Sequence, residues 1–370
     1  LHYPLRRQRQ MCIRDSERVA KFLILSGASD KIKPEKGEDI CLKDINQLLQ
    51  QTDYYTKLDK KGTIIPMLSE EYGVFSRMSH LKRVEAVAFI ILEQWSKIWT
   101  VSLDSRKIGH NYDLIKFFCI ASEIGATPFF HYDWGVSEKY LGVPLFDEYT
   151  NAHRIIEAEL DKFSKVKNRN IPPQIRSTMK EVLSLKGKEG QDFTGPGFIP
   201  EAKIVVVAHL ITQIIEGVVF SRKLGLMNGR EYFELRDKFR ALFGQDSLEK
   251  LDELKYDILD EYICNIAKNF IQKSFVTDKN IDILNSPLFE ELMVHHKENS
   301  FLISEKLKEF YDTERLQEVL KTVIEDTRKR KGNGDDTLIE ELLKLSDVQI
   351  LDKAEAVSYT HLTLPTKRIV

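Results

Sequence analysis

Apolar side chains recur every three or four residues along most of the chain, and this spacing restricts it to a fold built from packed helices. From Leu81 to Trp99 the apolar positions follow this rule, with Arg83 and other charged residues between them. Such a stripe faces a core on one side of a helix and water on the other. We therefore expect a mainly α protein, a multi-helix bundle whose two helical halves are joined by a Gly/Pro-rich segment.

The second half of the chain contains the clearest helix boundaries. A long apolar stretch, 201–224, ends at Gly225, a residue able to take the positive φ that closes a helix. Asn228 and Glu231 then form a capping-box pattern that begins the next helix, and Gly244 ends it. A third helix follows directly. Helices joined by such short loops pack as antiparallel neighbours.

A segment rich in glycine and proline divides the chain. Residues 187–200 contain four glycines and two prolines, a composition that interrupts both helices and strands. We predict an N-terminal helical domain over 17–186, with an aromatic-rich loop at 127–149. A C-terminal helical bundle is predicted over 201–350.

The two ends of the chain share one nucleotide sequence. One permitted choice of codons for 6–16, read as its reverse complement, encodes 356–366. The same string resembles a transposon-end adapter used in preparing sequencing libraries. We interpret 1–16 and 356–370 as translated adapter and exclude them from the fold. Their removal takes away six basic residues and one acidic residue, so the formal net charge of −2 becomes about −7.

This acidic balance disfavours a general binder of nucleic acids or membrane surfaces. Two basic runs, 162–176 and 328–331, leave weak nucleic-acid binding as an alternative, because phosphate contacts need clustered cations. The second run also fits the end of a helix, where cations complement the helix dipole. Nucleic acid is therefore an unlikely partner on composition.

The most apolar stretch of the chain, 204–220, is a candidate membrane span, and its polar residues decide against this interpretation. It contains Glu216, which is costly inside a bilayer, so we expect a buried helix and no membrane partner. Cys41, Cys119 and Cys264 are far apart and show neither a disulfide framework nor a zinc-binding pattern. We expect reduced thiols and a cytoplasmic protein.

The strongest candidates for ligand binding lie in the aromatic segment 127–149. His131, Asp133 and Trp134 stand together there among several phenylalanines and tyrosines. Aromatic rings beside a histidine and a carboxylate could stack on a small ligand and orient one of its polar groups. The alternative is a loop whose rings cover the bundle while their polar tips reach the surface.

A second polar set lies within the long apolar helix. His209, Gln213 and Glu216 are spaced i, i+4 and i+7, so they share one helical face. Metal ligands converge from one face in this way, yet the chain contains no Glu-x-x-His pair of the kind found in carboxylate-bridged metal bundles. We expect a hydrogen-bonded polar seam or the solvent side of the helix, and predict neither a metal site nor a cofactor.

The sequence contains no phosphate-binding loop, dinucleotide fingerprint, zinc-protease motif or nucleophile elbow. These absences favour a protein without catalytic activity but leave an enzyme open. We predict a structural or protein-interaction module that binds a protein partner or a second copy of itself. One alternative is a small-ligand-binding protein or enzyme using His131, Asp133 and Trp134. The other is a weak nucleic-acid binder using the two basic runs.

Overall fold

The computed structural model describes residues 41–63, 70–99, 108–127, 148–167, 200–244, 258–277, 290–298, 303, 306, 313–331 and 340–357. The regular elements within these residues are helices, and no strand occurs among them. The prediction of a mainly α, multi-helix fold is confirmed.

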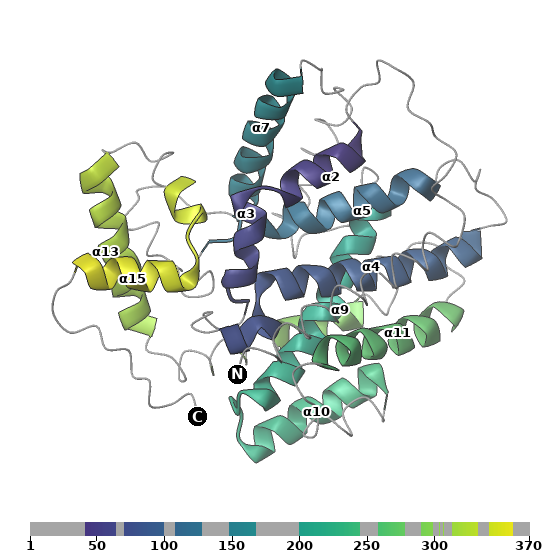
Figure 1. The fold of residues 1–370 in the computed structure, drawn as a ribbon. Helices are drawn as coiled ribbons and strands as arrows, with labels where there is room; N and C mark the ends of the chain where they lie inside the picture. The colour runs from purple at the N-terminus through teal and green to yellow at the C-terminus, as the bar shows by residue number, and fades with distance from the viewer. Residues whose placement is uncertain are drawn as a thin grey trace, which may run out of the picture.

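The described helices follow one another along the chain as shown in Figure 1. They are α2 (Leu42–Gln50), α3 (Asp53–Thr56), the 3-10 helices η1 (Lys57–Lys60) and η2 (Glu70–Phe75), α4 (Arg77–Trp99), α5 (Ile108–Glu123), α7 (Glu148–Lys167), α9 (Pro200–Lys223), α10 (Gly229–Phe243), α11 (Leu259–Thr277), α13 (Thr313–Lys331) and α15 (Asp347–Val357).

Helix α9 lies at the centre of the bundle. It packs against α4, α5, α10 and α11, and most of its apolar side chains are buried. Within the described part of the chain, 204–223 is the one helical stretch long and apolar enough to cross a membrane, and 94% of that window is buried inside the protein. The surrounding helices supply the apolar partners that a helix hydrophobic on nearly all sides requires.

Helices from both sides of the predicted linker share one hydrophobic core. Helices α4 and α5 precede the linker and α9, α10 and α11 follow it, and all contribute to the same buried cluster. Phe75 and Phe220 meet edge to face in this cluster, with ring centroids 4.4 Å apart. The linker 187–200 lies almost wholly outside the described residues, so the domain boundaries stay predictions.

The helix boundaries predicted at Gly225, Asn228 and Gly244 are confirmed. Gly225 follows α9 with a φ of 63°, and the N–H groups after the helix donate to carbonyls of its last turn. The Asn228 side chain accepts the N–H of Glu231, whose carboxylate in turn accepts the N–H of Asn228. Gly244 follows α10 with a φ of 101°.

Two details of the structure differ from what the sequence predicts: the burial of Arg83 on α4 and the extent of α15. Arg83, which the apolar stripe assigns to the solvent side of α4, is only 2% exposed. That assignment is wrong because the buried Glu216 and the half-exposed Asp260 pair with its guanidinium. Helix α15 continues through Val357 and so enters the segment 356–370, whereas 1–16 lies outside the described residues.

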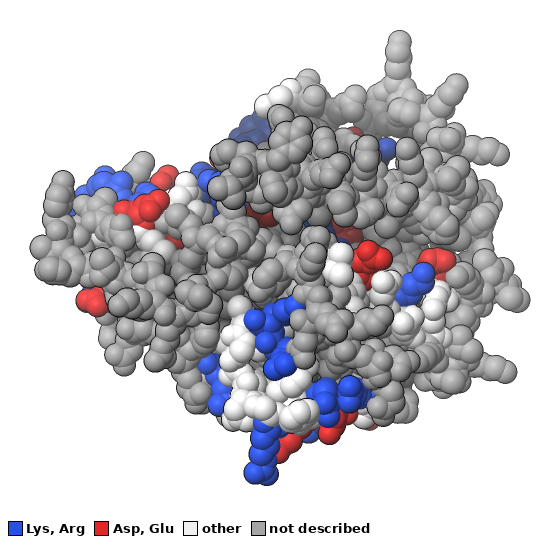
Figure 2. Space-filling view, turned by 60° about the horizontal axis from the view of Figure 1, so that its bottom comes forward, with Lys and Arg blue, Asp and Glu red and all other residues white. Residues whose placement is uncertain are grey.

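The described parts of the predicted basic runs lie on α7 and α13 and include ion-paired side chains. Lys162 contacts Glu159 at 2.7 Å, and Arg330 pairs with Asp326. A mixture of charges also covers the end of the molecule where α10 lies, where Lys and Arg side chains stand beside Asp and Glu side chains (Figure 2). Nucleic-acid binding stays an untested alternative.

Helices α13 and α15 pack together at one side of the bundle (Figure 1). The segment after η1 connects the start of α15 and the residues just before it to the rest of the protein. Lys61 Nζ donates to the carbonyl oxygens of Ala126 and Leu343, each at 2.7 Å. Asp347, the first residue of α15, accepts the N–H of Gly62 at 2.8 Å. A fully buried lysine therefore joins the C-terminal helices to the end of α5.

Burial lowers the pKa of Lys61 from 10.5 to about 7, although the nearby Asp347 acts in the opposite direction. In the unfolded chain the amine keeps its proton up to about pH 10.5, so the unfolded state binds more protons between pH 7 and 10.5. We expect the free energy of unfolding, measured by urea denaturation, to rise with pH across this window.

Two lysine variants isolate this effect. Lys61→Met should show a smaller rise with pH than the wild type, whereas Lys60→Met, at the exposed neighbouring position, should retain it. Identical pH slopes in all three proteins would contradict the titration of the buried amine.

Candidate metal centre

Charged side chains gather in the interior where α4, α5, α7, α9 and α11 approach one another. All except the half-exposed Asp260 are less than a tenth exposed. The group consists of Arg77, His80, Arg83, Glu123, Glu148, His209, Glu216 and Asp260. Burying a charge is costly unless a partner compensates it, so the contacts within this group determine its stability.

Helix α4 supplies the basic side of the cluster. Arg77, His80 and Arg83 are spaced i, i+3 and i+6, which places them along one side of the helix. All three are buried. This spacing is the sequence signal that could have revealed the site. The apolar periodicity of α4 hides it, because that pattern assigns charged residues to the solvent side.

Arg77 joins the ends of two helices. Its Nη1 donates to Glu123, the last residue of α5, at 2.8 Å, and to Glu148, the first residue of α7, at 3.1 Å. Burial acts to lower the pKa of Arg77, but the two carboxylates outweigh it and raise the pKa, so Arg77 stays charged. Gly125 permits this close approach, since a Cβ there would lie 1.9 Å from the Glu148 carbonyl oxygen.

Glu216 on α9 bridges two residues of α4. Its Oε2 lies 2.7 Å from His80 Nδ1, and its Oε1 accepts from Arg83 Nη1 at 2.6 Å. Burial acts to raise the pKa of this carboxyl, but His80 and Arg83 lower it by more, so Glu216 is ionised. Arg83 Nε also donates to Asp260 on α11 at 2.8 Å. These contacts tie α4, α9 and α11 together.

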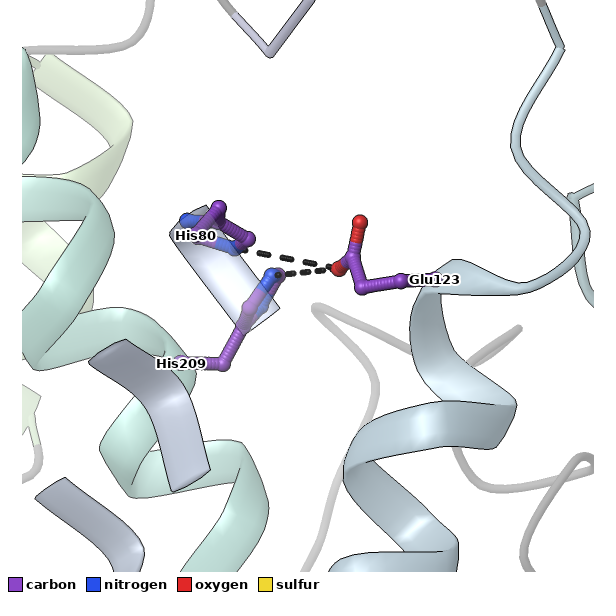
Figure 3. A group of neighbouring side chains, drawn as sticks. All are labelled: His80, Glu123 and His209. Carbon is purple, nitrogen blue, oxygen red and sulfur yellow. Dashed lines mark ion pairs between the residues drawn. The ribbon is translucent and has the colours of Figure 1, made fainter. Parts of the chain in front are cut away.

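His80, Glu123 and His209 form a His–Glu–His centre contributed by α4, α5 and α9. His80 Nε2 lies 3.7 Å and His209 Nε2 lies 3.6 Å from the same carboxylate oxygen, Glu123 Oε1 (Figure 3). The two imidazole rings meet edge to face with centroids 5.0 Å apart. Within the described ranges, this is the one group of His, Cys, Asp or Glu side chains whose spacing suits a metal ion.

The separations within the centre exceed those of hydrogen bonds and approach those of ligands around one ion. Hydrogen bonds between nitrogen and oxygen span about 2.7–3.2 Å. Two ligand atoms bound tetrahedrally at about 2.1 Å lie roughly 3.4 Å apart. A small inward movement of the side chains would therefore place all three atoms at bonding distance from one ion. Imidazole and carboxylate together suit Zn²⁺, Fe²⁺ or Mn²⁺.

The site residues predicted from the sequence have different outcomes. The three predicted ligand-binding residues lie outside the described residues: His131, Asp133 and Trp134. His209 and Glu216 are buried, so the solvent-side interpretation of their stripe is wrong. Gln213 completes the stripe, with its amide nitrogen 3.3 Å from His209 Nε2. Sequence reasoning missed the partners that these residues find on α4 and α5.

Comparison with known proteins adds no functional information. No protein-family model matches the chain, and no curated protein matches it. The functional conclusion therefore depends on the chemistry of the buried cluster.

Removal of the Arg83 charge should strongly destabilise the protein. Arg83→Met leaves the ionised Glu216 buried beside His80 without its guanidinium partner, and we expect the free energy of unfolding to fall by about 3–5 kcal/mol. Arg230→Met is the matched control, because the Arg230–Glu234 pair lies exposed on α10 and should contribute less than about 1 kcal/mol. Chemical denaturation measures both values. Similar losses in the two variants would refute the role assigned to the buried pair.

Proposed function

We propose that the chain is a metal-binding protein in which one divalent transition-metal ion links α4, α5 and α9 through His80, Glu123 and His209. The orientation of His80 carries this proposal. Its Nδ1 lies 2.7 Å from an ionised carboxylate, which only accepts hydrogen bonds, so Nδ1 bears the proton. In neutral His80 the lone pair on Nε2 then faces Glu123 Oε1. Two electron-rich atoms facing each other at 3.7 Å favour a cation between them.

The contacts of His209 support the same arrangement. The amide nitrogen of Gln213 lies 3.3 Å from His209 Nε2, and an ion bound at Nε2 would displace this amide, because the ring nitrogen has a single lone pair. The same Nε2 lies 3.6 Å from Glu123 Oε1. The Nε2 atoms of both histidines thus lie near one carboxylate oxygen, and neutral imidazole is the form that binds metals.

The charge balance of the cluster also supports a divalent ion. Two guanidinium groups face three buried carboxylates and the half-exposed Asp260. With neutral histidines, negative charge is in excess by two when Asp260 is counted and by one when it is not. One divalent cation cancels the excess of two and exceeds the excess of one by a single charge. The competing explanation is that both histidines are protonated.

The burial of the ligands favours a structural role for the ion. His80, Glu123 and His209 are 4%, 2% and 7% exposed. The number of ligands differs from that of closed structural zinc sites, which have four protein ligands, because three protein ligands leave a coordination position for water. Thr212, close to His209 on the same side of α9, has a fully buried hydroxyl without a hydrogen-bond partner among the described residues. A buried water would supply such a partner.

Metal content and thermal stability test the proposal. Protein produced with Zn²⁺, Mn²⁺ and Fe²⁺ in the medium should contain about one ion per chain by elemental analysis. Chelation should lower the melting temperature and metal addition should restore it, because an ion that binds only the folded state stabilises it. His80→Ala and His209→Ala should each lose the ion.

His153→Ala is the matched control for these variants. His153 lies on α7 with its side chain 39% exposed, and its replacement should leave the metal content unchanged. A wild-type protein that contains no ion and melts identically with and without chelator would overturn the proposal in favour of two protonated histidines.

We also propose a protein-interaction role, as predicted from the sequence. Exposed apolar side chains support it: Phe233 on α10 is 50% exposed and Val294 is 55% exposed. The Lys238–Glu298 ion pair, at 2.7 Å, joins the two segments that carry them. Light scattering over a range of protein concentrations should show self-association that weakens in Phe233→Ser. A monomer at every concentration would exclude the homo-oligomer.

A further inference from the structure

We infer that Glu216 is a positioning residue that fixes the tautomer of His80 and so makes its Nε2 atom the metal ligand. This role rests on the proposed metal centre and adds to it one carboxylate that contacts a ligand of the ion and not the ion itself. It also accounts for a buried acidic residue on the apolar helix α9 that does not itself belong to the group of metal-ligand candidates.

The position of Glu216 matches that of an outer carboxylate. It contacts His80 at Nδ1, the ring nitrogen that does not face Glu123. Histidines that bind metals usually donate their second ring N–H to a carboxylate or carbonyl, which orients the ring and increases the basicity of the ligating nitrogen. Glu216 therefore acts on the ion through His80, without touching it.

Glu216 is itself held in place by Arg83. Its second oxygen accepts from Arg83 Nη1 at 2.6 Å. The Arg83 guanidinium lies 5.4 Å from the centroid of the Phe220 ring and also donates to the carbonyl oxygen of Val74. Because both carboxylate oxygens of Glu216 have partners, the side chain cannot rotate away from His80 without breaking a buried charge-assisted bond.

The first test reads the tautomer directly in the wild-type protein loaded with Zn²⁺. Nitrogen-15 NMR of histidine-labelled protein distinguishes protonated from metal-bound ring nitrogens, and the His80 signals are assigned by their loss in His80→Ala. We expect a proton on Nδ1 and zinc on Nε2. Zinc bound at Nδ1 would overturn the role of Glu216.

The second test measures Zn²⁺ affinity in Glu216→Gln. Glutamine keeps the shape of the side chain, but its amide can donate to Nδ1 and drive His80 into the tautomer whose Nε2 is protonated. We expect the Kd for Zn²⁺ to rise about 10- to 100-fold. Asp260→Asn is the matched control, because it removes a carboxylate from Arg83 without touching His80. Its Kd should stay within about threefold of the wild type.

The outcomes separate this role from the metal centre itself. Equal Zn²⁺ affinity in Glu216→Gln and wild type would overturn the positioning role and leave the metal centre intact. A wild type that binds no Zn²⁺ would overturn both. If Glu216→Gln fails to fold, the NMR measurement on the wild type decides, since it requires no change at position 216.

Discussion

The buried contacts of Arg77 and Arg83 determine how the helices of this protein are arranged. Each guanidinium must reach carboxylates on neighbouring helices: Arg77 reaches α5 and α7, and Arg83 reaches α9 and α11. Apolar burial is non-directional, whereas these bonds fix how far each helix is rotated and shifted along its axis. His80 lies one helical turn from each arginine, so the same contacts place it where α5 and α9 meet.

Lys61 is a buried basic residue whose hydrogen-bond partners differ from those of Arg77. Arg77 faces carboxylates that keep it charged, whereas the two hydrogen-bond acceptors of Lys61 are backbone carbonyl oxygens. Neutral dipoles compensate burial less completely than carboxylates do, so the pKa of Lys61 falls while that of Arg77 rises. The residue that titrates near neutral pH, Lys61, therefore lies at the junction with α15. The arginines at the centre of the bundle stay charged.

The helical fold could be predicted from the sequence because its signals are local. The capping pair Asn228–Glu231 and the positive φ of Gly225 involve residues within one turn of a helix end. The site could not be predicted in this way, because its partners are distant in sequence: His80 and Glu216 are 136 residues apart. Apolar periodicity also hides Arg83, since it treats every charged residue on a helix as solvent-facing. Buried charge pairs become visible only when the helices are placed together.

The distance along the chain between Lys61 and its partner Leu343 has a consequence for synthesis. These residues are 282 positions apart, so a chain emerging from the ribosome carries the lysine long before one of its two acceptors exists. Arg83 likewise precedes Asp260 by 177 positions. Because an unpaired charge is costly to bury, the Arg83 side of α4 cannot be buried before α9 and α11 have been synthesised. The Arg83 side of α4 is thus made early and buried late, and it stays accessible to chaperones until its partners on α9 and α11 have been made.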